Sequence, residues 1–240
     1  MENYLNIKKR DIEKYFAIKK KQSRWHVTIS NGAKPIFIEI PFVLDESIAK
    51  LARLIPDGCL TKNLNRIFFH QKKDPRKIKL FSTLITRLFS KNIIFWRRTR
   101  DDGTGIYVNS ITLASFLYLL VGFSKAGEQM RIPSWIFNSP RKVKIAYLKQ
   151  AFDMEGTILK KLTEIRFGTK DEKFALDIKK LLFVVGIQSY HTYTTRPKQT
   201  SGQHRVSIYR KENFEKFKEI GFQIPHLKQR FKLLLKKYAL

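Results

Sequence analysis

The sequence predicts an α+β protein made of two pseudo-symmetric repeats of roughly a hundred residues, each with the element order αββαββα. An acidic residue followed by glycine closes an amphipathic stretch in each half, at Asp57-Gly58 and at Glu155-Gly156. Fourteen residues after each acid comes a polar residue plus lysine, as Gln71-Lys72 and as Thr169-Lys170. Any one match occurs easily by chance, but the common spacing indicates a duplication.

The ends of the two halves match as well. Gly122-Phe123 precedes Ile132-Pro133 in the first half, and Gly221-Phe222 precedes Ile224-Pro225 in the second. The duplication therefore extends through each half of the chain.

Three segments follow from the repeat. Residues 45–135 are the expected first repeat, and residues 136–240 are the second repeat with a basic C-terminal helix. Residues 1–44 have no counterpart and are expected to form a short basic extension. Alternating residues on both sides of Asn31-Gly32 predict a hairpin in this extension.

Hydrophobic periodicity predicts the elements of the first repeat. The expected bounds are 45–55 for a helix, 61–70 for strands, 75–91 for a helix, 93–100 and 105–109 for a hairpin, and 111–120 for a helix. Asp45 is the expected N-cap of the first helix. The apolar face of the second helix is formed by Ile78, Phe81, Leu84, Ile85 and Leu88.

The second repeat has the same predicted order. The expected bounds are 142–154 for a helix, 157–168 for strands, 171–185 for a helix, 187–196 and 203–210 for a hairpin, and 212–219 for a helix, followed by a terminal helix over 226–238. The linker over 131–141 contains two prolines and Asn138-Ser139, which are expected to break any helix.

Composition limits the classes of function. The chain has a formal charge of +28 at pH 7 and a pI near 10.2, which favours a polyanionic partner because phosphate contacts release counterions. The charge is dispersed among apolar segments, unlike a disordered basic tail. The longest apolar run, 111–123, is too short to span a bilayer, and the N-terminal sequence lacks the order of a secretion signal. We therefore expect no membrane association and an intracellular location, in the cytoplasm of a prokaryote or in an organelle.

Two acidic motifs carry a resemblance to a known family. The second reads Tyr147-Leu-Lys-Gln-Ala-Phe-Asp-Met-Glu155-Gly156 and is approached through Ile132-Pro-Ser-Trp135, whereas the first, Leu51-Ala-Arg-Leu-Ile-Pro-Asp57-Gly58, is more degenerate. With these motifs, residues 45–240 resemble a single-chain, two-repeat LAGLIDADG homing endonuclease. The resemblance implies a saddle of antiparallel sheets that binds double-stranded DNA, and a monomer that hydrolyses one phosphodiester in each strand of a long pseudo-palindromic target.

The resemblance also implies a metal site. If the two acid-ending helices pack side by side, the carboxylates of Asp57 and Glu155 meet and repel each other unless a cation lies between them. Oxygen ligands of this kind select Mg²⁺, for which Mn²⁺ is expected to substitute. The expected metal-binding residues are Asp57 and Glu155 with their neighbours Gly58 and Gly156.

Four further residues complete the expected catalytic set with the two acids. Lys72 and Lys170 would neutralise phosphate charge or polarise the attacking water. Gln71 and Thr169 would orient solvent by hydrogen bonding.

The expected DNA-binding residues lie on the predicted strands, and those within residues 187–210 lie at alternate positions, so that one face can reach base edges. They are Lys62, Arg66, Arg97, Arg98, Arg100, Lys160, Lys161, Arg166, Gln188, Tyr190, Thr192, Thr194, Arg196, Arg205, Ser207 and Tyr209. Individually, each could equally be a solvated residue on the outer face of a sheet.

The chain departs from the family at Pro56 beside Asp57 and at bulky residues in the second helix, and two other functions are open. Closely packed helices prefer small residues, which the first helix has in Ala49 and Ala52, but the second has Gln150 and Met154. One alternative is a non-cleaving DNA-binding regulator derived from such a nuclease. The other is an RNA maturase that assists intron splicing, with intron RNA as its partner, because the same saddle fold can bind structured RNA.

Overall fold

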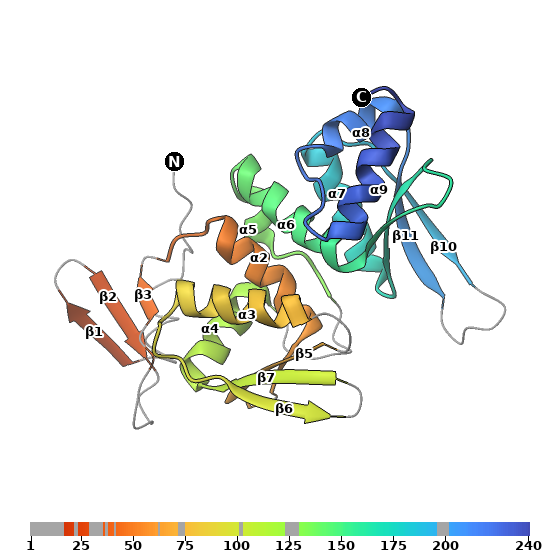
Figure 1. Cartoon of the computed structure of the whole chain (residues 1–240). Coiled ribbons are helices and arrows are strands. Elements are labelled where there is room, and N and C mark those ends of the chain that lie inside the picture. The colour runs from red at the N-terminus through yellow and green to blue at the C-terminus, as the bar shows by residue number, and fades with distance from the viewer. Residues whose placement is uncertain are drawn as a thin grey trace. The chain divides into compact units, whose positions relative to one another are not determined.

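The structure is a computed structural model that describes residues 17–21, 24–28, 36, 38–40, 42–61, 63–71, 75–100, 103–122, 130–195 and 202–240. It divides into two compact units, Met1–Glu128 and Gln129–Leu240 (Figure 1). Among the helices of the described residues, none is both long enough and apolar enough to cross a membrane.

A small antiparallel sheet precedes the first repeat. Its strands are β1 (Ala17–Lys21), β2 (Arg24–Thr28) and β3 (Ile38–Ile40), in the order β1-β2-β3. The pairing of β2 with β3 confirms that the chain doubles back between them, although Asn31-Gly32 itself lies outside the described residues. Strand β1 was not predicted, because three consecutive lysines give it no alternating pattern.

The first unit has the predicted order of elements. They are α2 (Glu46–Leu54), a 3₁₀ helix η1 (Ile55–Asp57), β4 (Cys59–Leu60), β5 (Arg66–Gln71), α3 (Pro75–Leu88), β6 (Trp96–Arg100), β7 (Gly103–Asn109) and α4 (Ile111–Val121). The Asp45 carboxylate accepts hydrogen bonds from the backbone N–H groups of Ser47 and Ile48 at 2.8 and 3.0 Å, which confirms its capping role.

The second unit repeats this order after one additional helix. Its elements are α5 (Ser134–Asn138), α6 (Arg141–Glu155), β8 (Gly156–Ile158), β9 (Ile165–Thr169), α7 (Glu172–Val184), β10 (Tyr190–Thr194), β11 (Gln203–Ile208), α8 (Lys211–Phe217) and α9 (Pro225–Lys237). The prediction of a helix-free linker was wrong at α5. Pro133 and Pro140 flank this single turn without interrupting it, and the Ser139 hydroxyl donates to the Trp135 carbonyl at 2.8 Å.

The two sheets have the same topology. The strand order is β4-β5-β7-β6 in the first unit and β8-β9-β11-β10 in the second, and all neighbours are antiparallel. Helices α3 and α4 contact the first sheet, and α7 packs on β9, β10 and β11 of the second (Figure 1). Two repeats with antiparallel sheets are therefore confirmed.

Equivalent aromatic pairs join helix to sheet in the two cores. Phe69 of β5 stacks on Phe81 of α3 with ring centroids 4.7 Å apart, and Phe167 of β9 meets Phe174 of α7 at 5.7 Å. All four side chains are fully buried, so both helices are held by the same kind of contact.

The turn between the first two strands is also duplicated. Leu64 and Leu162, 98 positions apart like Asp57 and Glu155, both have a positive φ near 50°. Their N–H groups donate to the carbonyls of Thr61 and Leu159 at 2.8 and 2.9 Å. The sequence does not predict this match, because leucine is rarely found in the left-handed region.

The start of the second unit is tied to α7. Arg131 donates two hydrogen bonds to the Asp177 carboxylate, at 2.7 and 3.0 Å, and the Ile132 N–H donates to the same group at 3.0 Å. These hydrogen bonds, followed by the charge of Asp177, raise the pKa of Arg131. The segment before α5 is therefore fixed to its own unit.

Candidate nucleic-acid interface and acidic helix ends

Both candidate metal-binding acids occupy the last position of a helical segment. Glu155 ends α6 and is exposed, one residue later than the predicted helix end. Asp57 ends η1, and its side chain lies outside the described part of the chain. In each unit the following glycine leads directly into the first strand of the sheet.

The glycines after the acids are required by close packing of the backbone. A Cβ atom on Gly58 would lie 2.6 Å from the Phe68 carbonyl oxygen, and one on Gly156 would overlap the Phe152 carbonyl oxygen. Backbone atoms cannot move aside as a flexible side chain can. The acid-glycine pair is therefore the point at which the chain passes from helix to strand with no space for a side chain at the second residue.

The polar candidates lie at equivalent strand ends. Gln71 is the last residue of β5 and Thr169 the last of β9, while Lys170 is exposed immediately after β9. The Thr169 hydroxyl accepts a hydrogen bond from the Asp171 N–H at 3.2 Å, so it also supports the start of α7. The Gln71 side chain and Lys72 lie outside the described residues.

Asp153, two positions before Glu155, has a structural role. Its carboxylate accepts hydrogen bonds from the backbone N–H groups of Gln223 and Ile224, at 2.9 and 3.4 Å. These hydrogen bonds tie the end of α6 to the segment that precedes α9. Within the described residues, no group of three or more His, Cys, Asp and Glu side chains could hold a metal ion.

The second sheet presents the predicted polar face. Antiparallel pairing places Thr192 beside Arg205 and Tyr190 beside Ser207, and Ser207 lies beside Arg166. Cross-strand partners point to the same face, so these residues form one surface. The opposite face carries apolar residues such as Phe167 and Val206, which are fully buried.

Several other candidates border this surface. Gln188 is exposed two residues before β10, and Tyr209 is exposed directly after β11. Thr194 is the last residue of β10, and Lys160 and Lys161 lie exposed in the turn between β8 and β9. Arg196 lies outside the described residues.

Glu164 is a polar-face residue that the sequence reasoning missed. Its carboxylate binds Arg166 through two hydrogen bonds, at 2.7 and 2.8 Å, and accepts a third from the Ser207 hydroxyl. Ser207 is only 3% exposed, so its hydroxyl serves Glu164 in this conformation. The spacing of Glu164 and Arg166 places both on one strand face and could have indicated the pair.

The first sheet has an aromatic and basic face. Trp96 stacks on Tyr107 with centroids 6.4 Å apart, and the Arg66 guanidinium lies 4.7 Å from the Tyr107 ring centroid. Arg66 also donates to the Asn109 side chain at 2.7 Å. Arg98, paired with Gly105, lies on the same face.

Arg97 does not share the face of Arg98. It pairs with Ile106, whose neighbour across the next strand is the buried Phe69, so its strand position belongs to the helix-covered face. Arg97 is still exposed because β6 is an edge strand. The side chain of Arg100 and the whole of Lys62 lie outside the described residues.

Two histidines stack between β10 and β11. The rings of His191 and His204 are 5.3 Å apart and nearly parallel, and Nε2 of His191 lies 3.1 Å from Nδ1 of His204. Burial first, and then the neighbouring His204, lower the pKa of His191 below its ordinary value of 6.5; Glu172 opposes this change and Lys179 adds to it. The pair therefore favours a neutral His191.

Replacement of His191 by glutamine is expected to reduce the loss of stability in acid. As the pH falls below 6.5, His191 becomes protonated in the unfolded chain but stays neutral in the folded protein. The free energy of unfolding therefore decreases with falling pH until the pH reaches the lower pKa of the folded state. Urea unfolding on both sides of pH 6.5 measures this effect. His226→Gln, an exposed change on α9, serves as the control, and an unchanged pH profile in His191→Gln would contradict the expectation.

The second unit matches a known family. Residues 142–221 match the family model described as LAGLIDADG-like domain, and this range contains the acid-glycine motif and the whole second sheet. Residues 142–221 are therefore similar to a LAGLIDADG-like domain, and the first unit has a sheet with the same strand order.

Known relatives include solved structures and curated sequences. The crystal structure of I-DmoI in complex with DNA and Mn is similar with a TM-score of 0.53 and 18% identity, over 74% of this chain and 97% of that chain. A DNA polymerase of Thermococcus hydrothermalis is 29% identical over 42% of this chain and 6% of its own length. Replication factor C small subunit of Methanocaldococcus jannaschii is 29% identical over 74% of this chain and 10% of its own length.

These curated relatives share only a module with this chain. The chain spans a tenth or less of the length of both proteins, whose names describe different activities. The similarity therefore concerns a segment within each longer protein, whereas the fold similarity covers almost all of I-DmoI.

Proposed function

We propose that this protein is a site-specific, metal-dependent endonuclease that cuts both strands of double-stranded DNA as a monomer. The observation that carries the proposal is the repeated acid-glycine junction: Asp57 and Glu155 each end a helical segment and precede the first strand of sheets with the same topology. A duplicated acid suits a substrate with two strands. The LAGLIDADG-like domain match and the fold of I-DmoI support the same function.

The proposed metal ligands are the carboxylates of Asp57 and Glu155, beside Gly58 and Gly156. Glu155 is exposed at the end of α6, where a hard cation can reach its oxygen atoms. A bound Mg²⁺ or Mn²⁺ would supply charge stabilisation for phosphodiester hydrolysis. I-DmoI was crystallised with DNA and Mn, which supports a divalent metal.

The remaining groups position and neutralise the substrate. Lys170 is exposed beside the end of β9, where it would pair with a phosphate, and Lys72 would do the same in the first unit. Gln71 and Thr169 would orient solvent at the two strand ends. The polar sheet faces supply hydrogen-bonding and stacking groups, among them Thr192, that suit contacts to DNA.

A cleavage assay tests the proposal directly. Purified protein with Mg²⁺ is incubated with a DNA library that includes the locus in which its own gene is inserted. Double-strand breaks at one site are the expected result. DNA binding without cutting, in Mg²⁺ and in Mn²⁺, would overturn the proposal and favour a non-cleaving regulator, the alternative suggested by Gln150 and Met154 in α6. Rescue of intron splicing without DNA cleavage would favour the maturase.

Glu164→Gln is expected to strengthen non-specific DNA binding and to increase its salt dependence. Loss of the carboxylate charge releases the Arg166 guanidinium, which can then pair with one more phosphate. The slope of log K against log salt should steepen by about 0.9, the value for one added contact. Fluorescence anisotropy with a random-sequence duplex at several salt concentrations measures the slope.

The matched control is Glu212→Gln, which removes the same charge from an exposed position on α8. It changes the net charge equally but releases no arginine of the sheet. Equal slopes for the two variants would show that Arg166 does not gain a phosphate contact.

A further inference from the structure

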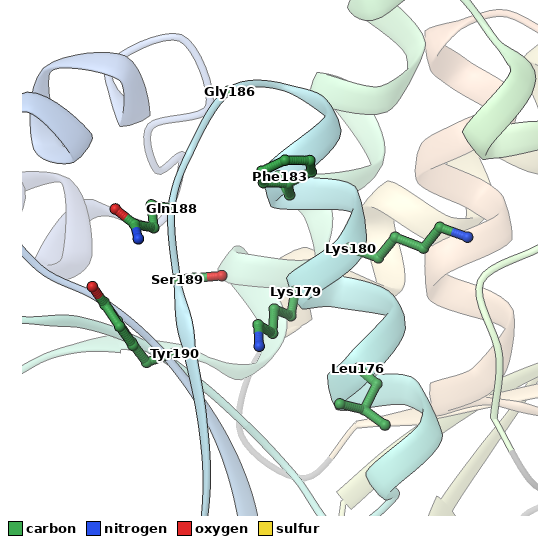
Figure 2. Close-up of a pocket in the computed structure, with 8 residues that line it drawn as sticks. All are labelled: Leu176, Lys179, Lys180, Phe183, Gly186, Gln188, Ser189 and Tyr190. Carbon is green, nitrogen blue, oxygen red and sulfur yellow. The ribbon is translucent and has the colours of Figure 1, made fainter.

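A groove with an apolar and basic lining runs between α7 and the chain that enters β10. It is lined by Leu176, Lys179, Lys180, Phe183, Gly186, Gln188, Ser189 and Tyr190 and has a volume of about 630 Å³ (Figure 2). All of these residues belong to the second unit, and two of them, Gln188 and Tyr190, are also among the expected DNA-binding residues.

Apolar side chains at this groove are exposed to solvent. Phe183 is 76% exposed, more than any other phenylalanine in the described residues, and Leu176 is 44% exposed. Exposed apolar side chains that lie together mark an interaction surface more often than isolated ones do.

Ser189 adds a polar group that requires a partner. It is 7% exposed, its side chain points from the strand segment toward α7, and its hydroxyl oxygen has no hydrogen-bond partner among the described residues (Figure 2). A buried hydroxyl without a partner costs free energy, which a ligand that reaches it would recover.

The first unit has a groove at the equivalent position. Aligning Phe81 with Phe174, which pack on equivalent strand residues, pairs Thr83 with Leu176 and Ser90 with Phe183. The first-unit groove is lined by Ser82, Thr83, Thr86, Arg87, Phe89, Ser90, Lys91 and Phe95, with a volume of about 640 Å³. The fold therefore accepts polar residues at these positions, so packing alone does not explain Leu176 and Phe183.

The charge and the strand at the groove indicate the chemistry of an occupant. Lys179 and Lys180 are exposed, and the lining contains no acidic residue. Strand β10 is the edge of its sheet in the described part of the chain and pairs on one side with β11. An edge strand beside a groove can pair with an added extended peptide.

We propose that this groove binds an extended acidic segment of a partner protein. Apolar side chains of the segment contact Leu176 and Phe183, its carboxylates pair with Lys179 and Lys180, and its backbone pairs along the edge of β10 or with Ser189. The exposed apolar side chains of Leu176 and Phe183 favour a protein segment over a nucleic acid, because a nucleic acid would bind mainly through phosphate contacts to Lys179 and Lys180. This surface is separate from the acid-glycine junctions and does not depend on DNA cleavage.

The test uses the full chain and a defined probe. The probe is a fluorescent peptide of about ten residues, the upper length of an ordinary strand, that alternates glutamate with valine, leucine and phenylalanine. Saturable binding, with amide NMR shifts along α7 and residues 186–194, is the expected result. The same peptide with lysine in place of glutamate should not bind.

Matched variants decide whether the groove is the site. The double variant Leu176→Thr, Phe183→Ser introduces the side chains found in the first unit and should weaken peptide binding about tenfold or more. The control Leu233→Thr, which changes an exposed leucine on α9, should leave peptide binding unchanged. Lys179→Glu with Lys180→Glu should abolish binding, whereas Lys232→Glu with Lys236→Glu on α9 should weaken it far less. Thermal unfolding and far-UV circular dichroism of each variant verify that it is folded.

Three results would overturn the proposal. One is equal peptide affinity of the Leu176→Thr, Phe183→Ser variant and the parent chain. Another is that the parent chain binds an RNA hairpin and not the peptide, and that the Leu176→Thr, Phe183→Ser variant no longer binds this RNA. The third is concentration-dependent self-association in sedimentation that the same variant abolishes, since a second copy of the chain would then be the occupant.

Discussion

Replacing Asp57 by asparagine or Glu155 by glutamine is expected to lower DNA cleavage by about 10³-fold while leaving DNA affinity within about threefold. Each change removes one carboxylate from the proposed metal ligands, and a loss of roughly 4 kcal/mol of transition-state stabilisation corresponds to that factor. Affinity is retained because most of the binding free energy comes from phosphate contacts along the sheets. Single-turnover cleavage and binding in Ca²⁺ measure the two quantities separately.

Asp153→Asn is the informative comparison for these variants. Asp153 lies two positions from Glu155 but accepts hydrogen bonds from the backbone of Gln223 and Ile224. Its replacement should lower stability and leave the cleavage rate of the folded protein nearly intact. Undiminished cutting by Asp57→Asn or by Glu155→Gln would refute the proposal that these acids hold the metal.

Gly156→Ala is expected to lower the free energy of unfolding by about 3 kcal/mol or more, because the added methyl group overlaps the Phe152 carbonyl oxygen. The end of α6 or the start of β8 must shift to relieve the overlap. Because Glu155 is the preceding residue, the shift also displaces its carboxylate. Urea unfolding measures the stability, and cleavage at a temperature where the variant remains folded measures the displacement.

Gly168→Ala provides the steric control in the same unit. Its Cβ would lie 2.5 Å from Nε2 of Gln203, the far end of a flexible side chain that can move aside. It should therefore cost much less than Gly156→Ala. If the two variants unfold at the same urea concentration, the tight passage from helix to strand is not what requires glycine at position 156.

Most helices and the duplication itself follow from sequence patterns. The apolar positions Phe81, Leu84 and Ile85 of α3 are buried as their helical spacing predicts, and Asp45 caps α2. Strand alternation also separates Val206 from Arg205 correctly. Local periodicity predicts these features because it depends on which side of an element faces the core.

Other features depend on contacts between residues distant in sequence. Arg97 and Arg98 look alike as basic strand residues, and only the pairing of β6 with β7 assigns them to opposite faces. Glu164 reaches Ser207 across 43 positions, and no local pattern predicts that this contact keeps Ser207 from solvent. The short helix α5 forms between two prolines because neither proline lies at a position where the helix requires a backbone N–H donor.

The sequence by itself determined the two repeats, the order of their elements and the acid-glycine pairs, since spacing and periodicity are properties of the chain alone. The three-dimensional structure decided why glycine must follow each acid, which arginines share a face, and where the groove beside α7 lies. The constraint on Gly156 comes from the backbone geometry at the end of its own helix, whereas the constraint on Gly58, the shared faces and the groove depend on how closely neighbouring strands and helices pack.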